Sequence, residues 1–222
     1  MDLKTAYFDL YGQNSITEYR WGQLTEILNK AKKERSAALK RQDQAGNAWY
    51  LSENMIGMML YADRFCENLV DFENKIDYLS ELGITYVHFM PLLKSREGNN
   101  DGGYAVSDYL EVDPRYGTME QFEKVIRLLK KKGIRTCVDF VLNHTAKEHV
   151  WVEEMKKGNR DYDDMYYMFD DRSIPDAYEK TMTQIFPEVA PGNFTYYPDL
   201  KKYVMTRFYE FQWDLNYRNP QV

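Results

Sequence analysis

Residues 118–142 read TMEQFEKVIRLLKKKGIRTCVDFVL, and this stretch decides the fold class. Its first part carries apolar residues at helical spacing, with Thr118 placed to cap a helix and Gly133 placed to end it. Its second part, residues 134–142, is a mainly apolar stretch of strand length. Such a run is typical of a strand that is buried on both faces of a parallel sheet. The stretch therefore predicts a helix followed by a buried strand.

The same order occurs upstream. Residues 55–60 (MIGMML) and 84–89 (ITYVHF) predict two further strands, and residues 72–82 between them carry one apolar helical face that Gly83 ends. A loop of about 25 residues is expected between the second strand and the helix that Thr118 begins. Strands that alternate with helices predict an α/β fold with a parallel sheet. In such folds function gathers at the carboxyl ends of the strands.

The two ends of the chain differ from this middle part. Residues 15–45 predict one helix, which ends at Ala45-Gly46-Asn47. After residue 145 the periodicity is lost, although aromatic residues remain frequent, so we expect an inserted irregular subdomain after the third strand. The predicted division is a helical segment at 1–50, three βα units at 51–145 and the aromatic-rich insertion at 146–222.

Charge and composition exclude several classes of protein. The net charge of the 222 residues is -6, which argues against nucleic-acid binding. The one basic run, residues 30–41, is interleaved with alanine and leucine and is interpreted as a solvated helix face. No run of about 18 apolar residues is present, so no membrane span is expected. Cys66 and Cys137 do not form a metal-type pair, and the first residues do not resemble a secretory signal. We therefore predict a cytoplasmic protein.

Five polar residues lie where the predicted strands end. His144 follows the third strand and could donate a hydrogen bond to a substrate hydroxyl, with Asn143 beside it to fix the loop. Tyr104 offers a flat face on which a sugar ring can stack. Asp101 could pair with an arginine to close a pocket, and Asp139 could orient its neighbours. A purely structural role for His144 or Asp139 stays open on this reasoning.

Two motifs connect these residues to a known family. GYAVSDYLEVDPRYGT (residues 103–118) and DFVLNH (residues 139–144) resemble the α-amylase superfamily of (β/α)8-barrel glycoside hydrolases and transglycosylases. A closer resemblance, to amylosucrases and sucrose hydrolases, rests on MIGMMLYADRF, DGGYAVSDY, NHTAKEHVW, FPEVAPGNF and FYEFQWDLNY. The resemblance implies a partial (β/α)8 TIM barrel, containing its first three strands, behind the end of an N-terminal helical domain.

The resemblance also implies roles for individual residues. It implies a glucosyl-binding subsite made by Asp101, Tyr104, His144 and Phe208, with Tyr104 as the stacking surface. Asp139 and Asn143 become signature residues with mainly structural roles. No metal ion and no other cofactor are implied.

The catalytic carboxylates of the family are not found in this sequence. Family chemistry is retaining double displacement, which uses an aspartate nucleophile and a glutamate acid/base. The nucleophile follows an arginine by two positions, and no carboxylate stands there after the arginines beyond His144, which are Arg160, Arg172, Arg207 and Arg218. We therefore expect no catalytic residue in this chain. It is expected to be the N-terminal portion of a larger enzyme and inactive alone, with the rest of the barrel supplied in cis or by a partner chain.

Several functions remain open at this stage. The leading one is a glucosyl-transferring or hydrolysing enzyme that acts on sucrose or a related α-glucoside, with a glucan as acceptor. The alternatives are another α-glucosidase of the superfamily, a non-catalytic sugar-binding derivative, and an unrelated α/β protein with chance motifs. The last alternative fails if Tyr104 and His144 line one concave surface.

Overall fold

The computed structural model describes residues 2–44 and 48–222. The chain divides into two compact units, one formed by Met1–Ser52 with Asn216–Val222 and the other by Glu53–Leu215. We call them the helical unit and the larger unit, and each is described by itself. The predicted boundary between residues 145 and 146, which separates the βα units from the insertion, falls inside the larger unit. The division at this point stays a prediction.

The helical unit contains α1 (Leu3–Tyr11), α2 (Ser15–Glu34), α3 (Ala37–Gln44) and the short 3-10 helix η1 (Trp49–Leu51). The prediction of one helix over 15–45 was wrong, because α2 ends at Glu34 and Arg35 is extended. Ser36 then accepts backbone hydrogen bonds from Leu39 and Lys40, so it begins a new helix. The predicted helix end at Ala45-Gly46-Asn47 lies outside the described residues.

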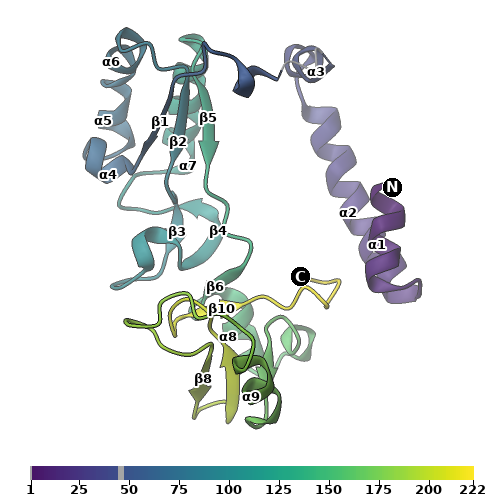
Figure 1. Cartoon of the computed structure of the whole chain (residues 1–222). Helices are drawn as coiled ribbons and strands as arrows, with labels where there is room; N and C mark the ends of the chain where they lie inside the picture. Colours follow the sequence, from purple (N-terminus) through teal and green to yellow (C-terminus); the bar gives the residue numbers. More distant parts are fainter. Residues whose placement is uncertain (1, 45–47) are drawn as a thin grey trace. The chain divides into compact units, whose positions relative to one another are not determined.

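The larger unit contains a parallel sheet in the order β1-β2-β5, formed by β1 (Gly57–Leu60), β2 (Tyr86–Phe89) and β5 (Arg135–Val138). The parallel α/β arrangement is therefore confirmed (Figure 1). The third strand is shorter than predicted, and the prediction that it is buried on both faces was wrong, since all four of its residues are only half-buried. It ends at Val138, and residues 139–142 leave the sheet to line a pocket.

Helices α4 (Ala62–Phe65), α5 (Leu69–Glu73) and α6 (Ile76–Glu81) connect β1 to β2, and α7 (Met119–Lys131) precedes β5. The predicted cap of α7 is present, since the Thr118 side chain accepts from the Gln121 amide while the Gln121 side chain accepts from the Thr118 amide. The helix predicted over 72–82 is divided at Asn74-Lys75 into α5 and α6. The core of this layer is apolar and includes fully buried Phe72, Leu79, Val87, Phe89, Val125 and Leu129.

The segment between β2 and α7 is more ordered than predicted. It holds an antiparallel hairpin of β3 (Leu93–Ser95) and β4 (Val106–Val112), joined through the 3-10 turn η2 (Asp101–Gly103). The hairpin pairing shifts register twice, which breaks the regular alternation from which a strand is read in a sequence.

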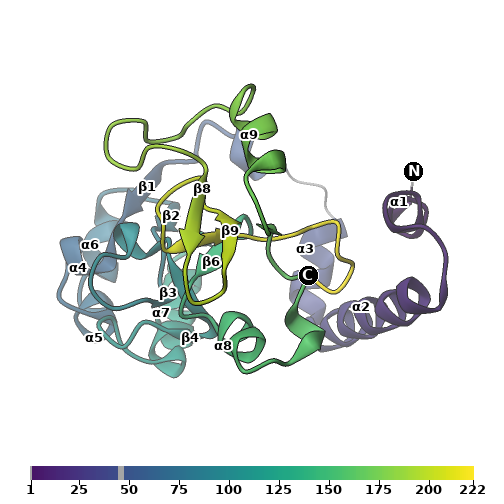
Figure 2. The same ribbon diagram turned by 90° about the horizontal axis from the view of Figure 1, so that it is seen from below.

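The segment after β5 is also more ordered than predicted. It contains β6 (His144–Ala146), α8 (Val150–Lys156), η3 (Arg160–Tyr162), β7 (Met168–Phe169), α9 (Ser173–Glu179), β8 (Phe194–Tyr197), β9 (Lys202–Met205) and β10 (Gln212–Asp214). Strands β7, β9 and β8 form an antiparallel sheet, of which β8 and β9 are labelled in Figure 2. Strand β10 pairs antiparallel with β6 (Figure 1). The aromatic and β-branched residues of β8 and β9 favour strand structure. The expectation of an irregular subdomain was thus wrong in this respect.

Candidate functional site

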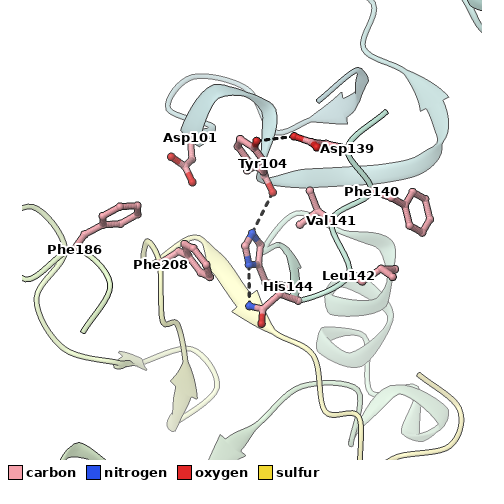
Figure 3. Close-up of a pocket in the computed structure, with 10 residues that line it drawn as sticks. Asp101, Tyr104, Asp139, Phe140, Val141, Leu142, His144, Phe186 and Phe208 are labelled. Carbon is pink, nitrogen blue, oxygen red and sulfur yellow. Dashed lines mark hydrogen bonds between the residues drawn. The ribbon is translucent and has the colours of Figure 1, made fainter. Parts of the chain in front are cut away.

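One pocket of about 450 Å3 gathers all six residues singled out in the sequence (Figure 3). Its lining consists of Asp101, Tyr104, Asp139, Phe140, Val141, Leu142, Asn143, His144, Phe186 and Phe208. Because Tyr104 and His144 line the same cavity, the alternative of an unrelated fold with chance motifs is wrong.

The pocket lies where the parallel strands end. Asp139 directly follows β5, and its amide donates to the carbonyl oxygen of Phe89, the last residue of β2. Tyr61 directly follows β1, and its hydroxyl lies against Gly102 of η2. The carboxyl ends of parallel strands are the usual position of a site in barrel folds, since all the following loops meet there.

Asp139 connects two side chains from different elements. Its Oδ2 accepts a 2.6 Å hydrogen bond from the Tyr104 hydroxyl, and its Oδ1 accepts a 2.7 Å hydrogen bond from His88 Nε2 on β2. Burial, with this hydrogen bond as the next cause, raises the pKa of Tyr104 far above its usual value, so the phenol stays protonated. The carboxylate therefore holds the Tyr104 ring in a fixed orientation at the pocket wall.

His144 is buried at the start of β6, with 3% of its surface exposed. Its Nε2 lies 3.2 Å from the carbonyl oxygen of Tyr104, and the ring of Phe208 lies 4.8 Å away between centroids. Burial lowers the pKa of His144 to about 4, so the imidazole is neutral near pH 7. A neutral imidazole donates one hydrogen bond and accepts one, which suits recognition of a hydroxyl group.

Asp101 enters the pocket from η2 in a left-handed backbone conformation, with φ of 53°. Its Oδ2 accepts a 3.0 Å hydrogen bond from the Gln212 side-chain amide, and burial raises its pKa. The proposed pairing of Asp101 with an arginine was wrong for the described part of the chain, where none of the ion pairs includes Asp101. The amide of Gln212 takes that place.

The pocket combines apolar rings with a few directed polar groups. Phe208 packs against His144 and lies 6.0 Å from Phe186 between ring centroids. Asp101 and Asp139 contribute carboxylates to the same lining. Such a lining can stack on the C–H face of a sugar ring while accepting hydrogen bonds from its hydroxyl groups.

Sequence reasoning missed three residues of this site. His88 could have been suspected as a histidine inside an otherwise apolar and aromatic strand near its carboxyl end. Gln212 and Phe186 gave no signal of their own, because each is brought to the pocket by the segment after β5.

Neither a metal cluster nor a membrane-crossing helix is found within residues 2–44 and 48–222. No group of three or more His, Cys, Asp or Glu side chains there could hold a metal ion. No helix in the same residues is long and apolar enough to cross a bilayer.

The family is established by comparison with known proteins. Residues 66–222 match the family described as alpha amylase, catalytic domain, and this match covers more than half of the chain. The chain therefore belongs to the alpha-amylase family.

Curated relatives include several α-glucoside enzymes. The chain is 36% identical over 155 residues to a trehalose synthase of Thermus thermophilus, a match that covers 68% of this chain and 15% of that protein. It is 31% identical over 156 residues to maltase 1 of Drosophila virilis (70% and 24% covered). It is 33% identical over 152 residues to an oligo-1,6-glucosidase of Parageobacillus thermoglucosidasius (67% and 25% covered). The chain thus spans a quarter or less of these relatives.

Solved structures give a matching result. A mutant of MutB in complex with the substrate sucrose superposes with a TM-score of 0.65 at 29% identity, covering 79% of this chain and 31% of that one. MutB is a trehalulose synthase from Pseudomonas mesoacidophila. The isomaltulose synthase SmuA from Protaminobacter rubrum gives a TM-score of 0.64 at 27% identity (76% and 30% covered). The likeness is to alpha-amylase-type barrels, of which this chain spans about a third.

Proposed function

We propose that this chain forms the glucosyl-binding part of a retaining α-glucosyl enzyme that acts on sucrose or a related α-glucoside, as amylosucrases do. The observation that carries the proposal is the single pocket that contains Asp101, Tyr104, His144 and Phe208. The Tyr104 ring is the stacking surface for the sugar, while Asp101 and His144 bind its hydroxyl groups.

The choice of an α-glucoside is supported by what the relatives' names say of them. They include a trehalose synthase, a maltase and an oligo-1,6-glucosidase, and a structure of MutB contains sucrose. Sucrose in particular, with a glucan as acceptor, is supported by the amylosucrase-like motifs FPEVAPGNF and FYEFQWDLNY, which supply Phe186 and Phe208 to the pocket. Both cysteines are free thiols, which supports a cytoplasmic location.

We further propose that the 222 residues bind a sugar but do not cleave it alone. A retaining mechanism needs a nucleophilic carboxylate and a carboxylic acid about 5–5.5 Å apart across the scissile bond. The carboxylates that line the pocket are those of Asp101 and Asp139, and Asp139 already holds Tyr104 and His88. The catalytic pair is therefore supplied by the rest of the barrel, in cis or from a partner chain.

Sugar binding to the 222-residue chain tests the first proposal. Saturation-transfer NMR and calorimetry with sucrose, maltose and trehalose, with galactose as control sugar, should detect binding of the α-glucosides. The Asp101→Ala variant should bind sucrose about tenfold more weakly, because a hydrogen bond to a charged group is lost. Asp170→Ala, the same change at an exposed residue outside the pocket, should bind like the wild type.

Failure to bind any of these α-glucosides, or unchanged binding by Asp101→Ala, would contradict the proposal. Release of fructose from sucrose by the purified chain would contradict the second part alone. A non-catalytic sugar-binding protein is the alternative. Coding DNA that continues past codon 222 into an apolar strand with Arg-x-Asp supports the enzyme, whereas sugar binding without such a continuation or a second piece supports the alternative.

A further inference from the structure

Strand β10 places two buried polar side chains beside His144. Gln212 and Asp214 are 0% and 4% exposed, and they share one face of the strand because side chains alternate along it. Trp213 between them lies on the other face, against Tyr166 and Tyr197. In the antiparallel pairing of β10 with β6, Asp214 is the direct partner of His144.

Asp214 uses both of its carboxylate oxygens. Oδ1 accepts a 3.0 Å hydrogen bond from the Asn143 side-chain amide, and Oδ2 accepts a 2.9 Å hydrogen bond from the backbone N–H of Arg207. Because a carboxylate can only accept, the Asn143 side chain must turn its nitrogen, not its oxygen, toward Asp214. The carboxylate thus determines which way the Asn143 amide faces.

The same Asn143 nitrogen also lies 3.1 Å from Nδ1 of His144. An amide nitrogen is a donor only, so the Asn143 contact makes Nδ1 an acceptor, whereas the Gln212 nitrogen, 3.0 Å from Nε2, would by the same rule make Nε2 the acceptor. Burial, which lowers the pKa of His144 to about 4, keeps the ring neutral near pH 7. The Tyr104 carbonyl oxygen decides between the two tautomers, because it can only accept and lies 3.2 Å from Nε2, which must carry the proton to donate to it. The Gln212 nitrogen donates to Asp101 instead.

We propose that Asp214 is a positioning residue for His144. By orienting the Asn143 amide, it fixes the imidazole in the Nε2-protonated tautomer, and so presents a donor beside Tyr104. The tautomer follows from the hydrogen bonds alone, while its use in holding a sugar hydroxyl rests on the proposed function.

The experiment measures the tautomer directly in the 222-residue chain. Ring 15N shifts of 15N-histidine-labelled protein distinguish a protonated from an unprotonated nitrogen, and loss of signals in His144→Gln assigns the ring. In the wild type at pH 7, Nε2 should be protonated and Nδ1 should be unprotonated. In Asp214→Ala the Asn143 amide is released and can turn over, so an Nδ1-protonated population should appear. Asp199→Ala, an aspartate change on the exposed surface, should leave the ring unchanged.

Sucrose binding is the second measurement, and Asp214→Ala should weaken it about tenfold, since a misplaced proton leaves a buried polar group unpaired. If Asp214→Ala does not fold, Asn143→Ala removes the same donor to Nδ1 and must give the same mixed tautomers. A wild-type ring protonated on Nδ1 overturns the proposal. So does a folded Asp214→Ala protein with only the Nε2-protonated form. A wild type that shows the expected tautomer but binds no α-glucoside would contradict the proposed function and leave this inference standing.

Discussion

His149 makes the stability of the larger unit sensitive to acid. The residue precedes α8, where its Nδ1 accepts a 3.3 Å hydrogen bond from the Trp151 amide, and only 6% of its surface is exposed. Burial lowers the pKa of His149 to about 4. Protonation of Nδ1 removes the acceptor that caps the helix and places a charge among the rings of Tyr109 and Trp151.

The size of the effect follows from the difference between the folded and the unfolded pKa. The unfolded chain binds a proton at His149 below about pH 6.5, whereas the folded chain binds it only near pH 4, so stability falls as the pH falls between these values. From pH 7 to pH 5 this amounts to about 2 kcal/mol, and His144 contributes about the same. Asp214 acts in the opposite direction by about 1 kcal/mol, because burial raises its pKa to about 6. The net loss from these three groups is about 2–3 kcal/mol.

Urea unfolding at pH 7 and pH 5, followed by fluorescence, measures this loss in the wild type and in His149→Asn. Asparagine retains an acceptor for the Trp151 amide but does not titrate. Any packing cost of the substitution is the same at both pH values and cancels in the comparison. The free energy of unfolding of His149→Asn should therefore fall by about 2 kcal/mol less than that of the wild type. An equal fall in both proteins would refute the assignment of the acid sensitivity to His149.

Two substitutions test the turn that carries Asp101 and the core beneath the sheet. Gly102 has φ of 65°, and a Cβ there would lie 2.9 Å from the Tyr61 hydroxyl. Gly102→Ala should therefore cost about 1–2 kcal/mol in thermal denaturation and weaken sucrose binding. Gly98 also has a positive φ but open space around it, so Gly98→Ala should lower stability through its backbone alone and leave sucrose binding unchanged. An equal loss of sucrose binding in both variants would contradict this reasoning. Phe89→Ala, in the buried core, should lower the free energy of unfolding in urea by about 3–5 kcal/mol, and a loss under 1 kcal/mol would show that the packing is wrong.

The sequence was sufficient where a structure depends on neighbours along the chain. The cap of α7 requires only Thr118 and Gln121 at the right spacing, and both directions of the capping box are present. Strands β2 and β5 likewise lie in mainly apolar stretches between a glycine turn and a polar loop. Local sequence rules predicted these elements correctly because their structure depends on residues that are close in the sequence.

Local rules failed where pairing is distant or irregular. Strand β6 pairs with β10, which follows it by more than 60 residues, and both strands have three residues. Strands this short contain too few alternations for a pattern to emerge above chance. The break at Ser36 was missed for another reason, since the flanking residues favour helix and only the side-chain oxygen competes for the backbone amides.

In the site, too, prediction succeeded for some residues and failed for others. The polar residues that face the pocket were predicted, whereas those that hydrogen-bond to them from behind were not. Motif resemblance identified Tyr104 and His144 but not Gln212 and Asp214, which lie behind them on β10. The triplet Gln212-Trp213-Asp214 is entirely buried, and two of its three side chains are polar. Buried polar groups almost always have hydrogen-bond partners, so a short strand of this composition must lie against a polar cluster. The composition of this triplet therefore points to positioning residues only once the structure has shown that the triplet is buried.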